Sequence, residues 1–263
     1  MSWCVFPPAT QEVQMDEKWA FVKKKEKNCQ EGEADERCGD NWDHVAFAPE
    51  HRLVLTTVPG KRSAEKVQEL VADVKQRLEG RVPRLITTDE YAAYPQAILN
   101  AYSTEVVPPR TGKPGRPKAP QQVPLPELHY ATVHKTREKG RVVKVVLNVV
   151  FGLVAAVMAA VSASRASRHI NTAFIERHNG TDRNRNSRKV RKTYCFSKDW
   201  DTHEAVGYFT MYSYNFCWPV RTLGVRGEDG HGQDRTPAMV AGLADHVWHL
   251  AEWLSRPAAC RTT

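Results

Sequence analysis

The chain has 263 residues, 41% of them hydrophobic, and a formal net charge of +8. This length fits one large domain with appendages, and the hydrophobic share is enough to bury a core. The basic balance favours a polyanionic partner such as a nucleic acid. The six cysteines form no CxxC pair, which argues against a zinc ribbon or a redox motif, and scattered thiols suit a cytoplasmic protein.

The sequence predicts neither a signal peptide nor a membrane span. Residues 1–11 lack the basic start and the apolar run of a signal peptide. The apolar stretch 145–163 is interrupted by Asn148 and Gly152, and β-branched residues before the glycine give way to alanines after it. This pattern predicts a buried strand, a glycine turn and a buried helix, and no contact with a membrane.

The first half of the chain alternates strand and helix patterns. Val67, Leu70, Val71 and Val74 recur at helical spacing behind Ser63, a candidate N-cap. The expected elements are strands at 12–22, 42–48 and 52–58, a helix at 63–80, a strand at 84–88 and a helix at 91–102.

A change in composition follows the second helix. Seven of the nineteen residues in 108–126 are proline, which predicts a linker or an extended insertion. Its segment 112–118 (GKPGRPK) resembles an AT-hook, a short basic motif that lies in the DNA minor groove, although a plain basic loop also fits.

The second half begins with a predicted hairpin and continues with helices. The expected elements are strands at 128–136 and 141–150, helices at 153–161 and from 171 to 179, a helix at 203–218, a flexible joint at 224–234 and a terminal helix at 237–254. The order of elements predicts an α/β fold, a ribonuclease-H-like mixed sheet flanked by helices. We expect a catalytic domain over 1–220, with 108–126 as a basic insertion, and a C-terminal helical extension over 221–263.

Three carboxylates stand out in this layout. Asp16 lies in the middle of an apolar strand, where a charge is unfavourable unless it is paired or binds a cation. Asp89 follows a strand end, where open α/β sheets place ligands, and Glu176 lies on a predicted helix. Such acids can hold the two Mg²⁺ ions that assist phosphoryl transfer. Neighbouring acids that compete for the same role are Glu17, Asp40, Asp43 and Glu90.

The segment 168–198 is the most unusual part of the chain. It contains nine Lys or Arg side chains and only two acids, Glu176 and Asp182, interleaved with Asn, Thr and Ser. These residue types contact phosphates and sugars. A carboxylate that binds metal beside a DNA groove explains both the basic charge and the isolated glutamate, whereas a solvated helix face explains only the charge.

Four segments resemble the DDE transposases of bacterial insertion elements, close to the insertion-sequence-one type. They are VQMDEKWAFVKKK around Asp16, LVLTTVPGKRS, LITTDEYAAY around Asp89, and INTAFIERHNGTDRNRNSRKVRKTYCFSKD around Glu176. The resemblance covers roughly residues 11–220, and RTPAMVAGL beyond them is also similar to the family.

This resemblance implies a ribonuclease-H-like enzyme that cuts and joins DNA with Mg²⁺, or with Mn²⁺. It assigns the catalytic, metal-binding triad to Asp16, Asp89 and Glu176. It also implies a homo-oligomer that bridges element ends and target DNA in the bacterial cytoplasm, at the nucleoid. The residues expected to contact the DNA are Asn179, Arg183, Arg185, Arg188, Lys189, Arg191, Lys192 and Lys198.

The chain also departs from the family pattern. Relatives usually carry a zinc ribbon and a helix-turn-helix before the catalytic domain, and nothing ahead of residue 12 predicts them. We therefore expect a separate end-recognition protein as a partner. Two alternatives stay open: a non-catalytic DNA-binding remnant of a transposase, and a cellular nuclease of the same fold.

Overall fold

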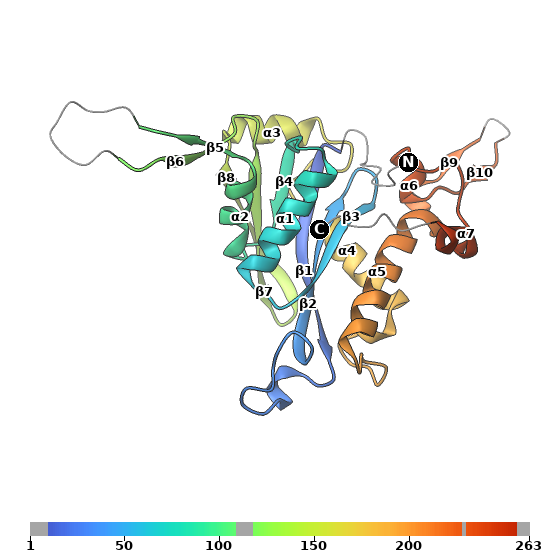
Figure 1. Ribbon diagram of the computed structural model, residues 1–263. Helices are drawn as coiled ribbons and strands as arrows, with labels where there is room; N and C mark the ends of the chain where they lie inside the picture. Colours follow the sequence, from blue (N-terminus) through green and yellow to red (C-terminus); the bar gives the residue numbers. More distant parts are fainter. Residues whose placement is uncertain (1–9, 109–117, 228–229, 257–263) are drawn as a thin grey trace.

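A six-stranded mixed sheet forms the centre of the molecule (Figure 1). The computed structural model describes residues 10–108, 118–227 and 230–256. The strand order is β3-β2-β1-β4-β7-β8, in which β1, β4 and β7 run parallel and the other neighbours are antiparallel. The strands are β1 (Glu12–Val22), β2 (Gly39–Ala48), β3 (Leu53–Gly60), β4 (Leu85–Thr88), β7 (Tyr130–Glu138) and β8 (Arg141–Phe151).

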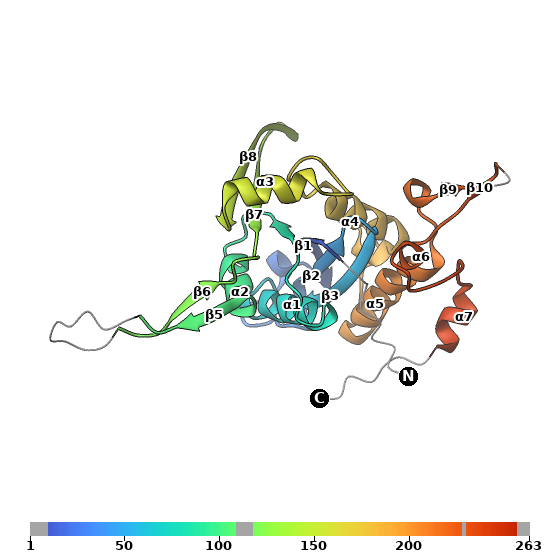
Figure 2. The ribbon, with the colours of Figure 1, turned by 90° about the horizontal axis from the view of Figure 1, so that it is seen from above.

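Helices cover both faces of this sheet, and Figure 2 shows α1 and α2 on one side and α3 and α4 on the other. The long helices are α1 (Ala64–Arg77), α2 (Ala93–Ala101), α3 (Val154–Ser162), α4 (Ala173–Arg185) and α5 (Trp200–Cys217). Short 3-10 turns are η1 (Glu26–Asn28), η2 (Ser187–Lys189) and η3 (Arg221–Leu223). The predicted mixed sheet flanked by helices is therefore confirmed.

Helix α1 begins at its predicted cap and packs on the sheet through the apolar residues that predicted it. The Ser63 hydroxyl accepts a hydrogen bond from the Lys66 N–H at 3.4 Å, so Ser63 caps the helix as predicted. Val67, Leu70 and Val74 are fully buried against the sheet in the largest core cluster. Val13 and Met15 of β1 enter the same core, while the alternate residues of β1 face α4.

The proline-rich insertion contains a strand that the sequence did not predict. Strand β6 (Gln121–Pro124) pairs with β5 (Ser103–Val106), and this hairpin projects from the body (Figure 1). Most of the predicted AT-hook, 112–117, lies outside the described residues.

The prediction of a buried strand at 145–150 and a buried helix at 153–161 was wrong in its burial. Strand β8 stands at the edge of the sheet, and most of its side chains are exposed. Helix α3 buries only Val157, Ala160 and Val161. An apolar run predicts a strand but cannot show whether a neighbour covers it.

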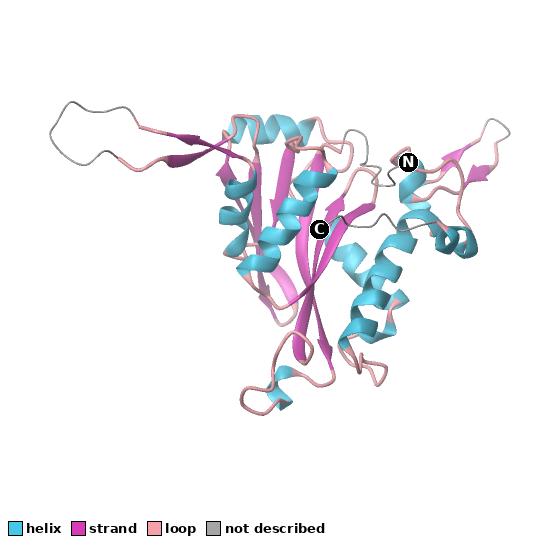
Figure 3. Cartoon of the chain, viewed as in Figure 1, coloured by secondary structure: helices cyan, strands magenta, loops and turns pink. Residues whose placement is uncertain are grey.

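The predicted terminal helix at 237–254 is two short helices, α6 (Pro237–Val240) and α7 (Leu250–Ser255) (Figure 3). Gly242 follows α6 with a left-handed φ of 73°, and the Leu243 N–H closes the turn onto Ala238, an arrangement that ends helices. Trp248 packs on Phe216 of α5 with ring centroids 4.6 Å apart. Two two-residue strands, β9 (Val225–Arg226) and β10 (Gly232–Gln233), form a hairpin in the predicted joint.

Among the helices of the described residues, none combines the length and the apolar character needed to cross a lipid bilayer.

Candidate active site

The three predicted acids come from three elements and line one cavity of about 670 Å³. Asp16 lies in the middle of β1, Asp89 follows the C-terminal end of β4, and Glu176 lies in the first turn of α4. Strands β1 and β4 are parallel neighbours, which brings Asp16 close to the end of β4. The Asp89 carboxylate accepts the Tyr91 N–H at 3.1 Å, which fixes its orientation.

Helix α4 is held along β1 by a polar ladder, which we define as the contacts that Gln14, Asp16 and Lys18 make with α4. The Gln14 amide oxygen accepts the Ile175 N–H at 3.1 Å. One turn further, the Asn179 amide donates to Asp16 Oδ2 at 2.8 Å. Alternate strand residues thus match successive helical turns, which sets the register of the helix that carries Glu176.

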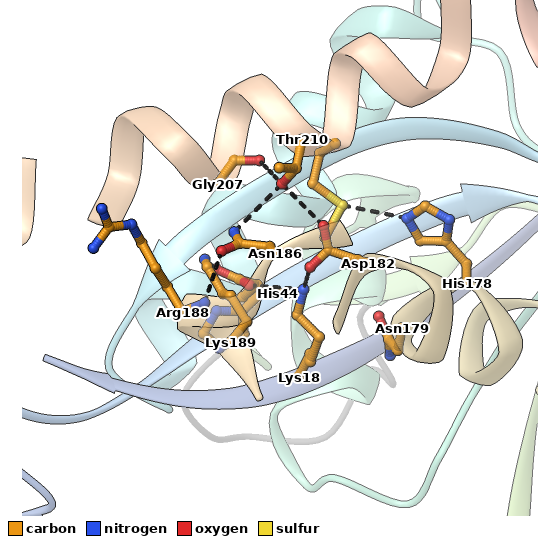
Figure 4. Close-up of polar contacts among 12 residues, drawn as sticks. Lys18, His44, His178, Asn179, Asp182, Asn186, Arg188, Lys189, Gly207 and Thr210 are labelled. Carbon is orange, nitrogen blue, oxygen red and sulfur yellow. Dashed lines mark hydrogen bonds and ion pairs between the residues drawn. The ribbon is translucent and has the colours of Figure 1, made fainter. Parts of the chain in front are cut away.

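Lys18 ends this ladder in a cluster of four buried charges, formed by Lys18, Asp43, Asp182 and Lys189. Figure 4 shows the contact between Lys18 and Asp182, with Lys189 close by. All four side chains are at most 3% exposed. Lys18 Nζ pairs with Asp182 and lies 3.1 Å from Asp43 Oδ2, and Lys189 Nζ lies 2.6 Å from Asp43 Oδ1. The charges balance, so the cluster joins β1, β2, α4 and η2 without a net buried charge.

Five carboxylates line the cavity, and their partners separate them into two groups. Glu17 accepts hydrogen bonds from Arg62, Glu90 pairs with His134, and Glu176 pairs with Lys135. In the described part of the chain, neither Asp16 nor Asp89 forms an ion pair with a basic side chain. These two acids are therefore the cavity carboxylates without a direct contact to a basic side chain in the described residues.

The pKa of Asp16 is raised, as expected for a carboxylate without a direct basic partner. Burial raises the pKa of Asp16 to about 7, and repulsion from the carboxylates of Asp89 and Glu17 adds to the rise. Glu176 acts in the same direction. Burial and the charge of Asp89 also raise the pKa of Glu17, and its contacts with Tyr94 and Arg62 oppose that rise.

Basic side chains surround the acids. The cavity lining includes Arg62, Lys135, Arg137, Arg183 and Arg191. The first three were not predicted as site residues, because they lie on β7 or after β3, far in sequence from the basic segment. Arg62 also stacks on Tyr91, with its guanidinium 4.2 Å from the ring centre. A groove with acids at its centre and cations around them suits a polyanion that is bound together with a metal ion.

The predicted DNA-contact residues divide into three groups. Asn179, Arg183 and Arg191 line the cavity. Arg188 is half-buried, while Lys192 and Lys198 are exposed and lie outside the cavity lining.

The remaining two residues are corrections. Lys189 is buried in the charge cluster, because Asp43 compensates its ammonium group, so it cannot reach DNA. Arg185 donates to the Thr210 carbonyl oxygen at 2.8 Å and stacks on Trp218, so it fastens α4 to α5.

The donor set fits a divalent cation in its chemistry. Hard oxygen ligands are what Mg²⁺ and Mn²⁺ prefer, and a cation would relieve the repulsion between Asp16 and Asp89. Within residues 10–108, 118–227 and 230–256, no three Asp, Glu, His or Cys side chains form a complete ligand group. Glu176 is instead held by Lys135 and by the Thr172 hydroxyl, whose oxygen lies 2.7 Å from Glu176 Oε1.

No protein-family model and no curated protein matches this chain. The geometry of the cavity is therefore the basis for a functional proposal.

Proposed function

We propose that this protein is a DNA transposase of the DDE type, which cuts and joins element ends by metal-dependent phosphoryl transfer. The strand order β3-β2-β1-β4-β7, with β2 antiparallel and β4 and β7 parallel to β1, supports a ribonuclease-H-like fold. The edge strand β8 extends that arrangement by one antiparallel strand.

One observation supports this proposal above the others. Asp16 and Asp89 face the same cavity without a basic partner, while arginines and lysines line its sides. Two like charges held together in a half-buried site are unfavourable unless a cation joins them. In this proposal the surrounding basic side chains would neutralise the phosphates of a DNA strand that reaches the cation.

In the proposed reaction, Asp16, Asp89 and Glu176 would hold Mg²⁺ or Mn²⁺, which polarises the scissile phosphate and lowers the pKa of the attacking hydroxyl or water. Asn179 orients Asp16 through its hydrogen bond to Oδ2. Arg183 and Arg191, on and after α4, line the cavity and would contact phosphates of the DNA backbone. The polar ladder keeps α4 at a fixed distance from β1.

The test is transfer of a labelled duplex oligonucleotide into supercoiled plasmid, with Mg²⁺ or Mn²⁺. Asp16→Asn, Asp89→Asn and Glu176→Gln should each lower the rate at least about 100-fold, because each removes a carboxylate that would hold the metal ion stabilising the transition state. The matched controls are Asp40→Asn and Asp201→Asn, acids outside the cavity lining, which should keep the activity of the unmodified protein.

Two outcomes would contradict the proposed function. Activity that survives Asp89→Asn would contradict the triad. Degradation of RNA·DNA hybrids without any joined product would favour a cellular nuclease of the same fold.

The contact between Glu176 and Lys135 favours a second candidate, a DNA-binding protein without catalysis. If this ion pair persists on DNA, the third acid is not free for a metal ion. This candidate predicts DNA binding that weakens with salt and is unaffected by Mn²⁺. A Mn²⁺ binding isotherm that disappears in Asp16→Asn would argue against it.

A further inference from the structure

The outer edge of the sheet at β8 is protected only toward its two ends, where its pairing with β7 is irregular. The sheet ends at β8, so among the described residues no strand pairs with the other side of its backbone. Edge strands are usually short, charged, interrupted by proline or distorted by bulges. Strand β8 has eleven residues, and its charged side chains are only Arg141 and Lys144. The two irregularities in its pairing with β7 leave a regular stretch from Lys144 to Val149.

The side chains of β8 are also apolar and open to solvent. Val142, Val143, Val145 and Leu147 are between 45% and 54% exposed. Leu153, Val154 and Met158 at the start of α3 are 77%, 63% and 52% exposed. A long apolar edge of this kind is a template for another strand, and in a stable soluble protein it is covered.

The sequence of β8 (RVVKVVLNVVF) is self-complementary in one antiparallel register. A two-fold axis perpendicular to the sheet would relate the two copies of β8. Side chains directly opposite each other in an antiparallel pair point to the same face, so the axis must pass between a residue and its own copy. An axis at Val146 pairs the regular stretch 144–148 with itself and places Lys144 opposite Asn148 and Val145 opposite Leu147. An axis at Lys144 would instead bring two ammonium groups together.

The register at Val146 also has a charge argument in its favour. The Asn148 amide donates to Glu90 Oε1 at 2.8 Å, so a lysine opposite Asn148 comes near the carboxylate of Glu90. The five regularly paired residues give a strand contact about 17 Å long at 3.4 Å per residue. The exposed apolar side chains at the start of α3 would add apolar area beside it.

We propose that two copies of this chain associate through β8, antiparallel about Val146, so that the two sheets continue into one. This inference does not rest on the proposed transposase activity, because it needs neither DNA nor metal.

The first test is sedimentation equilibrium of the purified protein without DNA or metal, between about 1 and 100 µM. We expect a dimer. The double variant Val145→Lys with Leu147→Lys should sediment as a monomer with unchanged circular dichroism, since both side chains are already exposed in the single chain. The matched control, Val123→Lys with Leu254→Lys, changes two exposed apolar residues elsewhere and should stay dimeric.

The second test fixes the register. Only an axis at Val146 places residue 146 opposite itself, so Val146→Cys should give a disulfide-linked dimer on mild oxidation, in excess of the unmodified protein. Val145→Cys, which faces Leu147, should not. A monomer at 100 µM, or a dimer that survives the two lysine substitutions, would overturn the proposal, and a monomer would assign the edge to a different partner.

Discussion

Replacing Lys18 by Met removes one of the four charges in the buried cluster while keeping a side chain of similar length. Asp43 retains Lys189 at 2.6 Å, but Asp182 loses the ammonium group with which it pairs and keeps the Thr210 hydroxyl at 3.0 Å. Removing one partner of a buried ion pair typically costs about 3–5 kcal/mol. We therefore expect the free energy of unfolding to fall by about that amount, a large share of the roughly 5–15 kcal/mol of a typical domain.

Equilibrium unfolding in urea at pH 7.5, followed by circular dichroism without metal, measures this change. The informative control is the double variant Lys18→Met with Asp182→Leu, which restores neutrality with apolar groups. Its loss should be smaller than that of Lys18→Met alone. A loss below about 1 kcal/mol in the single variant, or a double variant that adds the two single losses, would refute the account of a charge-balanced cluster.

The same cluster gives the unmodified protein an acid limit. Burial alone would raise the pKa of Asp43, but the ammonium groups of Lys189 and Lys18 outweigh it and hold the pKa well below its usual value. The folded state therefore binds the proton less tightly than the unfolded chain does. The stabilisation is complete above about pH 5 and is lost as the pH falls below the unfolded value of about 3.9. Unfolding midpoints measured from pH 6 to pH 2 should show this loss.

Three further predictions concern the cavity. Because the pKa of Asp16 is raised to about 7 in the folded protein, the carboxyl group destabilises the fold increasingly as the pH rises from about 4 through 7. Asp16→Asn should therefore raise the free energy of unfolding at pH 8 by at most about 4 kcal/mol and have little effect at pH 4. Equal effects in thermal melts at both pH values would contradict this. Lys135→Met should strengthen Mn²⁺ binding in calorimetry, because it frees Glu176 from its ion pair; weaker or unchanged binding would show that the pair does not compete with metal. Arg183→Ala should reduce the slope of log affinity for DNA against log salt concentration by about one phosphate contact. Arg185→Ala should lower the stability of the protein and leave this slope unchanged. The reverse result would mean that α4 presents its other face to DNA.

The sequence alone determined the elements whose signals are local. Helix α1 follows from apolar residues at helical spacing behind Ser63, and the order of strands and helices was sufficient to predict a mixed sheet. The positions of Asp16 in a strand and Asp89 after one were also local features. The sequence pattern was wrong at 237–254, where one helix was predicted. The left-handed Gly242 ends this helix after α6.

Only the tertiary structure decided which side chains meet. Lys189 and Arg185 lie in a basic run that predicts a surface, yet one is buried against Asp43 and the other is packed on α5. Lys135 and Arg62 line the site although neither was predicted as a site residue. Strand β8 has the composition of a buried strand and lies at an edge. Periodicity reports the conformation of a segment, whereas burial and charge pairing depend on residues from other elements, such as Asp43 for Lys189, which no local pattern records.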